Sequence, residues 1–398
     1  MSTPGNGTRG NASRGSVEAA VAAMLACQQD NGALIASPDF EQYHYCWLRD
    51  SSFAAYAFDR CGEHEASARY HDWASAAIAG IGEQIDTATQ QRQAGQSLDT
   101  RTLPPARFRL DGTVAADGWP NFQVDGYGTW LWALREHLSR AGRGGLPAGF
   151  RRSAQRAASY LDAFALDACY DVWEENGDGV HASTLACVYG GLTSAAVLLD
   201  EPGLLRRARE VQSHLRVAAG AAGRFRKSSV STAVDASMLW LATPFALVDD
   251  HDPLFEMTLR EITGQLTFDG GIRRFPTDTF FGGGAWPVLT AWLGWHQAVT
   301  GDLEAAHRNL AWVAGHIDAD GRLGEQFGGD RRQPEMYREW VGRWGHPARE
   351  LLWSHAMFAV LSTELGTTPA AARTTGATHS KNDPHVPAAI AVRKGAGQ

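Results

Sequence analysis

The residues best suited to chemistry in this sequence are two adjacent glutamates behind a tryptophan, in Asp171-Val172-Trp173-Glu174-Glu175. An acid–base catalyst needs a carboxyl group whose pKa is held up by apolar or like-charged surroundings. The Trp173 indole and the charges of Glu175 and Asp171 would supply both influences to Glu174. Two consecutive glutamates alone are more typical of a solvated helix start, so this segment needs a second, distant acid.

That second acid is Glu325, in Gly321-Arg322-Leu323-Gly324-Glu325-Gln326. The fragment follows a turn and by itself is typical of an exposed loop. We therefore expect Glu325 to be more solvated than Glu174 and to stay ionised. A protonated acid and an ionised carboxylate from different parts of the chain could face each other across a pocket and cleave a glycosidic bond.

Three further segments carry residues that bind sugars in proteins, namely aromatic plates beside charged groups. Residues 43–50 combine three aromatic side chains with an arginine and an aspartate, and residues 118–126 form a Gly- and Pro-containing loop around a tryptophan. Residues 270–286 hold two arginines and three consecutive glycines, which indicate close backbone approach or positive φ angles. Helix caps, turns and core packing are the structural alternatives for these segments.

Other kinds of site find little support. His355 follows a serine, yet no Gly-x-Ser-x-Gly elbow precedes it, which argues against a Ser/His/Asp triad. The five cysteines lack metal-ligand spacing and are interpreted as reduced core thiols. We therefore predict no metal and no cofactor.

Composition limits the partners. The formal net charge of −8 argues against nucleic-acid binding, and 14 tryptophans favour a ligand that stacks on aromatic rings. The sequence shows neither a signal peptide nor about 20 continuous apolar residues for a membrane span. A cytoplasmic protein with a sugar as its ligand is predicted. The oligomeric state stays open, with a monomer favoured.

Apolar residues recur at helical spacing along most of the chain, and strand-like alternation is scarce, so an all-α fold is predicted. Residues 1–15 and 366–398 are expected to be disordered, and residues 16–365 to form one catalytic domain. Helix pairs wrapped into a toroid fit this length better than a four-helix bundle does. The expected helices cover 16–28, 51–60, 65–81, 127–139, 150–164, 183–199, 202–218, 235–241, 253–266, 285–299, 303–316 and 349–365. The chemical segments would lie in the connections before them and converge on one face.

In their order along the chain, these motifs resemble glycoside hydrolase family 15, the glucoamylase family. The shared patterns are Tyr-x-Tyr-x-Trp-x-Arg-Asp at 43–50, Trp-(x)3-Gln-x-Asp-Gly at 119–126, Asp-x-Trp-Glu-Glu at 171–175, Gly-x-x-Arg-aromatic-Pro-x-Asp at 271–278, Gly-Gly-x-x-Trp at 282–286, Glu-Gln at 325–326 and Ala-Arg-Glu-Leu-Leu-Trp-Ser at 348–354. The resemblance implies an (α/α)6 barrel with a funnel-shaped pocket that removes single glucose units from non-reducing ends with inversion.

The resemblance also implies residue roles. Glu174 would be the general acid and Glu325 the general base. The other implied roles are gripping the terminal glucose (Arg49, Asp50, Arg274), binding hydroxyls near the scissile bond (Glu175), forming the walls (Tyr45, Trp47, Trp119, Trp286, Trp353) and lying near the catalytic water (Tyr43).

Two departures from the family pattern concern the pocket wall, where Phe280 replaces a frequent tyrosine and Cys46 a frequent aromatic residue. Without additional domains the chain resembles the bacterial isomaltose glucohydrolase branch. We therefore expect an inverting α-glucosidase for short α-1,6-linked glucosides. The alternatives are a glucoamylase acting on α-1,4 links, a trehalase, or a non-catalytic sugar-binding protein.

Overall fold

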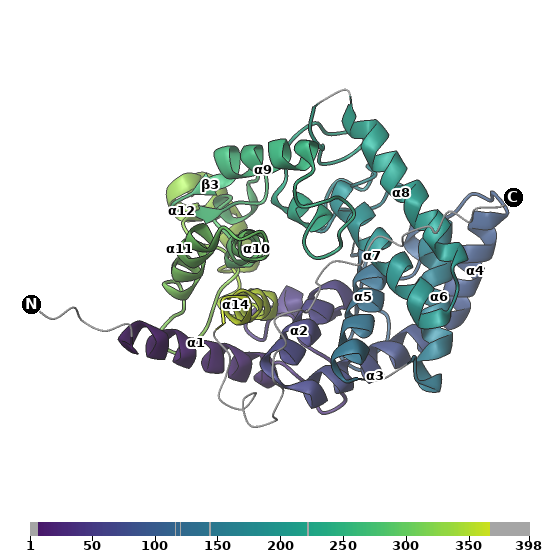
Figure 1. Cartoon of the computed structure of the whole chain (residues 1–398), viewed down its shortest axis with the longest axis horizontal. Coiled ribbons are helices and arrows are strands. Elements are labelled where there is room, and N and C mark those ends of the chain that lie inside the picture. The colour runs from purple at the N-terminus through teal and green to yellow at the C-terminus, as the bar shows by residue number, and fades with distance from the viewer. Residues whose placement is uncertain (1–6, 116, 120, 143–144, 221–222, 367–398) are drawn as a thin grey trace, which may run out of the picture.

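A ring of helices forms the protein, seen along its axis in Figure 1. The computed structural model describes residues 7–115, 117–119, 121–142, 145–220 and 223–366. The predicted disordered tail, residues 366–398, lies almost wholly outside this range, as do residues 1–6 of the predicted N-terminal segment. The first helix, α1 (Gly7–Ala26), begins before the expected start at residue 16.

Six inner elements close the ring, each in contact with the next: α2 (Leu48–Cys61), α5 (Asp125–Arg140), α7 (Ala182–Leu199), η3 (Ala236–Leu241), α10 (Pro287–Val299) and α14 (Leu352–Glu364). Outside them lie α1, α3 (His64–Gly80), α6 (Ala148–Phe164), α8 (Gly203–Gly220), α9 (Pro253–Leu266) and α11 (Leu303–Ala314). Each outer helix precedes an inner element, which is the arrangement of an (α/α)6 barrel. The predicted fold is therefore confirmed.

The inner helices are apolar because they are covered on all sides. The most apolar of them, α7, has the length and hydropathy of a membrane span, yet 83% of that stretch is buried inside the protein. Two glycines let α5 and α7 approach closely, since a Cβ at Gly191 would lie 2.5 Å from the Cα of Gly128. The centre of the barrel is filled by Phe53 and the aromatic rings around it, including those of Trp240 and Trp292.

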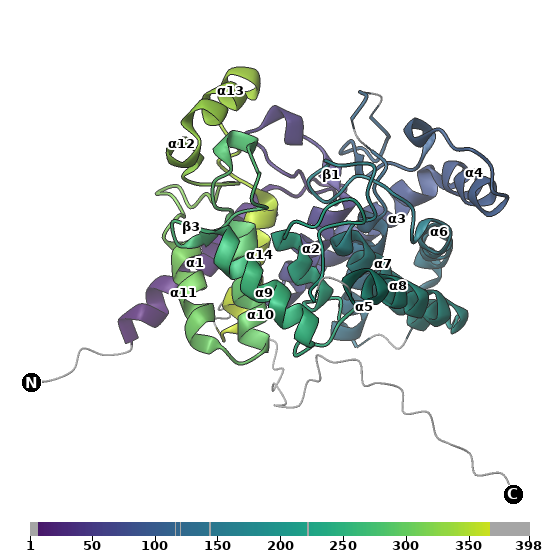
Figure 2. The same ribbon diagram turned by 90° about the horizontal axis from the view of Figure 1, so that it is seen from above.

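The predicted helix at 235–241 is a short 3-10 helix instead, η3. Its extension as an α-helix is opposed by Pro244, which has no backbone N–H to donate and disfavours helical geometry in the residue before it. Two α-helices and one short helix were not predicted: α4 (Gly82–Gln93), α13 (Pro334–Trp344) and α12 (Gly329–Arg332). Helices α12 and α13 project together from one side of the ring (Figure 2).

Two small antiparallel ladders lie between the helices. Strands β1 (Cys46–Trp47) and β2 (Arg107–Phe108) form the first, in which Trp47 is paired with Arg107. Strands β3 (Thr267–Phe268) and β4 (Gly271–Ile272) form the second. The short 3-10 helices η1 (Glu41–Tyr43), η2 (Thr100–Thr102) and η4 (Phe280–Gly282) complete the described elements.

Several predicted helix starts were misplaced, with consequences for the site. Helix α2 begins at Leu48, so Arg49 and Asp50 belong to its first turn rather than to the preceding connection. Helix α14 begins at Leu352, which places Trp353 in its first turn as well. The chemical residues therefore come from connections and from the first turns of inner helices, and they converge on one end of the barrel as predicted.

Candidate active site

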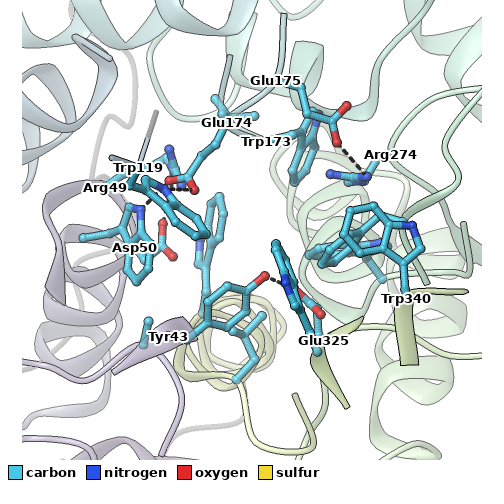
Figure 3. A pocket seen from close by; sticks show the side chains of 18 of the residues that line it. Tyr43, Arg49, Asp50, Trp119, Trp173, Glu174, Glu175, Arg274, Glu325 and Trp340 are labelled. Carbon is cyan, nitrogen blue, oxygen red and sulfur yellow. Dashed lines mark hydrogen bonds and ion pairs between the residues drawn. The ribbon is translucent and has the colours of Figure 1, made fainter. Parts of the chain in front are cut away.

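One pocket gathers nearly all the residues that the sequence singled out (Figure 3). Its volume is about 440 Å³, within the range of about 300–1,000 Å³ that is common for small-molecule sites. Of the predicted site residues, those that line it are Tyr43, Trp47, Arg49, Asp50, Trp119, Glu174, Glu175, Arg274, Trp286, Glu325 and Trp353. Glu174 and Glu325 lie on opposite sides of the pocket.

Glu174 is held between two indole N–H groups. Trp47 donates to Oε1 and Trp119 donates to Oε2, the latter at 2.5 Å. The loop turns sharply here, with Glu174 in the left-handed region at φ 65°. Asp171 stabilises this turn because its Oδ1 accepts hydrogen bonds from the backbone N–H groups of Trp173 and Glu175, both at 3.0 Å.

Burial raises the pKa of Glu174, as predicted, while the positive charge of Arg49 and the Trp47 hydrogen bond oppose that rise. The charge of Asp50 raises the pKa further. Glu175, expected to act as this like-charged neighbour, turns away from Glu174 and pairs with Arg274 at 3.2 Å. The surroundings of Glu174 therefore suit a carboxyl group that gives up a proton.

Glu325 is buried, with 1% of its surface exposed, so the expectation of a solvated carboxylate was wrong. Its backbone N–H donates to the carbonyl of Ala348 at 2.9 Å, and its Oε1 accepts a hydrogen bond from the Tyr43 hydroxyl at 2.7 Å. Its Oε2 has no hydrogen-bond partner among the described residues. Burial raises the pKa of Glu325 to about 7, against the lowering effects of the Tyr43 bond and of Arg274.

An arginine and two carboxylates form a rigid polar group at the base of the pocket. The Arg49 guanidinium donates to Asp50 at 2.9 Å, to Gln123 at 3.0 Å and to Asp125 at 3.1 Å. Arg49 and Asp50 are both buried. Because these groups are fixed before a ligand arrives, they can grip sugar hydroxyls with little loss of side-chain entropy.

Arg274 occupies the opposite wall. Its guanidinium bonds the Asp278 carboxylate at 3.0 Å and 2.5 Å and pairs with Glu175. The buried Arg274 guanidinium is thus neutralised by two carboxylates. The glycine prediction is confirmed, because Gly282 and Gly283 have φ angles of 79° and 65°.

Tyr45 is the predicted wall residue that does not line the pocket. Its hydroxyl donates to Asp117 at 3.0 Å, and its ring contacts the guanidinium of Arg107. The resemblance therefore misplaced Tyr45, whose ring and hydroxyl are held by Arg107 and Asp117 instead.

Sequence reasoning missed two tryptophans that line the pocket, Trp340 and Trp344 of α13. Phe280, Trp173, Val172, Leu351, Asp117, Gly118 and Ala36 complete the lining. A signal for α13 was present, because Pro334 is well suited to a first helical turn and Tyr337, Trp340 and Trp344 then fall on one face.

The site can therefore place a sugar among aromatic walls, between two carboxyl groups with raised pKa values that lie on opposite sides of the pocket. In sequence, residues 12–373 match the family model described as Glycosyl hydrolases family 15. The chain belongs to glycoside hydrolase family 15. The family match and the barrel together show that the protein is a glycoside hydrolase.

A relative supports this assignment along most of the chain. The isomaltose glucohydrolase of Kribbella flavida is 39% identical over 359 residues, covering 88% of this chain and 93% of that protein. An uncharacterized glycosyl hydrolase of Methanocaldococcus jannaschii is 26% identical over 284 residues, covering 68% and 42%.

Solved structures of family members share the fold. A wild-type glycosidase has a TM-score of 0.87 and 37% identity, with 92% of this chain and 100% of that chain covered. A glycosidase variant in complex with glucose has a TM-score of 0.87, 36% identity and the same coverage. A bacterial glucoamylase complexed with acarbose has a TM-score of 0.67 at 17% identity, covering 89% of this chain and 56% of that one, and supports the fold alone.

Proposed function

We propose that the protein is an inverting exo-α-glucosidase that releases β-glucose from the non-reducing ends of short α-1,6-linked glucosides. The observation that carries this proposal is the pair of carboxyl groups on opposite sides of one pocket, Glu174 bonded by two indole N–H groups and Glu325 bonded by the Tyr43 hydroxyl. The preference for α-1,6 links rests on the Kribbella flavida relative.

In the proposed reaction, Glu174 donates its proton to the glycosidic oxygen as the bond to the anomeric carbon breaks. A water attacks the opposite face of the sugar, and Glu325 takes its proton. Inverting enzymes use carboxyl groups roughly 6.5–9.5 Å apart, which leaves room for that water. The indole N–H groups of Trp47 and Trp119 then stabilise the anionic Glu174, since they point at the oxygens where charge develops.

Anomeric proton signals test the reaction directly. We expect purified protein to convert isomaltose faster than maltose or trehalose, with β-glucose appearing first and α-glucose only by later mutarotation. First-formed α-glucose would contradict inversion. Turnover of maltose without isomaltose would overturn the α-1,6 preference, and binding of the three sugars without turnover would favour a sugar-binding protein.

A change at Tyr43 should move the acid side of the pH profile. The Tyr43 hydroxyl stabilises the ionised Glu325, so in Tyr43→Phe the pKa of Glu325 should rise. A base must be ionised, and activity below about pH 7 should fall more than activity at higher pH. Hydrogen bonds to charged groups contribute about 1.5–3 kcal/mol, so a shift of roughly 1–2 pH units in the acid limb of kcat/KM is expected.

Tyr189→Phe, on the partly buried side of α7 away from the pocket lining, is the matched control for this change. Its profile should overlay that of the unmodified protein. An unshifted or downward-shifted acid limb in Tyr43→Phe would contradict the assignment of Glu325 as base.

We also propose a cytoplasmic location. All five cysteines are free and buried, as in proteins of reducing compartments. Cell fractionation followed by an isomaltose assay tests this, and activity confined to the medium would contradict it.

A further inference from the structure

A buried arginine lies directly behind the two indoles that hold Glu174. The guanidinium carbon of Arg107 is 3.9 Å from the ring centroid of Trp119 and 5.2 Å from that of Trp47. Arg107 is 2% exposed and is not among the residues that line the pocket. It therefore contacts the residues that hold the acid without touching the cavity in which a sugar would lie.

The strand pair β1–β2 sets this position, because Arg107 is the cross-strand partner of Trp47. The ring of Tyr45 contacts the same guanidinium at 3.9 Å. Asp117 accepts from Nη2 at 2.7 Å, and the backbone carbonyl of Gln42 accepts from Nη1 at 3.2 Å. Asp117 also accepts a hydrogen bond from the Tyr45 hydroxyl at 3.0 Å, so Arg107, Asp117 and Tyr45 are all bonded to or in contact with one another.

A planar guanidinium suits this place in a way that an ammonium does not. It can lie against several aromatic faces while its edge donates to Asp117 and Gln42. A cation at an indole face and a carboxylate at the indole N–H polarise the ring in the same direction, which strengthens the N–H as a donor. Arg107 thus fixes the orientation of the Trp47 and Trp119 rings and strengthens their N–H groups as hydrogen-bond donors.

We propose that Arg107 is a positioning residue for the general acid, acting on Glu174 through the indoles of Trp119 and Trp47. It holds the two rings so that the Glu174 carboxyl points toward the leaving oxygen and stays stabilised after it has given up its proton. This inference rests on the proposed function, in which Glu174 is the proton donor.

Two substrates with different leaving groups separate this role from a merely structural one. The leaving group of isomaltose is the 6-hydroxyl oxygen of the second glucose, which needs a proton, whereas the leaving group of p-nitrophenyl α-glucoside is a stabilised phenolate, which needs little protonation. We expect Arg107→Met to lower kcat on isomaltose at least ~10-fold and kcat on the aryl glucoside less than ~3-fold, with KM little changed, since general acids contribute roughly 10²–10⁴-fold. Arg107→Lys, which keeps the charge but lacks the plane, should show the same selective loss.

Glu174→Gln is the reference for a selective loss. Arg156→Lys is the matched control, because Arg156 makes a similar paired contact with Asp86 at 2.7 Å and does not line the pocket. Equal losses on both substrates, or no loss, would overturn the role of Arg107. If Arg107→Met fails to fold, judged by circular dichroism, Arg107→Lys decides the question by the same comparison. An unmodified protein that hydrolyses neither substrate would instead overturn the proposed function, and the inference with it.

Discussion

Replacing Glu325 with alanine should lower kcat on isomaltose by at least ~10²-fold, because general bases contribute roughly 10²–10⁴-fold. The Glu325 carboxyl group is buried in the lining of the pocket, and its Oε1 accepts a hydrogen bond from the Tyr43 hydroxyl. Its loss removes the group that takes the proton from the attacking water. Steady-state kinetics of the variant on isomaltose measures the effect.

Adding azide to the Glu325→Ala variant makes the test specific for the missing base. The small anion attacks without giving up a proton and can enter the space left by the Glu325 side chain, so it should partly restore turnover and yield β-glucosyl azide. Asp320→Ala, at an exposed acid in the preceding turn, should keep normal activity. Near-normal turnover of Glu325→Ala without azide would mean that another residue is the base.

Glu174→Gln should lower kcat as much as Glu325→Ala does, but by removing the proton donor instead of the proton acceptor. The amide keeps the shape of the side chain but has no acidic proton to give to the glycosidic oxygen. We expect kcat on isomaltose to fall by at least ~10²-fold, since general acids contribute roughly 10²–10⁴-fold. The decline of kcat/KM at high pH, which reports deprotonation of the acid, should disappear from the residual activity.

Asp178→Asn is the control for this substitution, since Asp178 is an exposed acid in the same loop. It should leave both the rate and the pH profile unchanged. A Glu174→Gln variant that retains the high-pH decline would indicate a different proton donor.

The sequence predicted the site better than it predicted the elements that surround it. Motif residues such as Arg49, Asp50 and Trp353 were found through the resemblance to the family, and each lies in the first turn of an inner helix beside the pocket. The same resemblance implied the pairing of Glu174 with Glu325. Periodicity was enough to recognise these inner helices.

Contacts made in three dimensions could not be predicted in this way. The burial of Glu325 depends on the far-off Tyr43 and on the backbone of Ala348, neither of which marks the local sequence. Trp340 and Trp344 reach the pocket because α13 packs against Phe280 and Phe281; their helical spacing could have revealed α13 but not this contact. Arg107 lies in a two-residue strand, too short to be recognised from alternation.

The hydrogen bond between Tyr43 and Glu325 joins residues 282 positions apart, across the place where α2 and α14 close the ring. The surroundings of Glu325, the proposed base, therefore come from the two ends of the catalytic domain. They form only when nearly the whole domain has folded. Contacts of such long sequence separation form late and slowly in folding. Helices can exist in a partly folded chain, but the pairing of Tyr43 with the proposed base cannot, so we expect turnover itself to be a measure of completed folding.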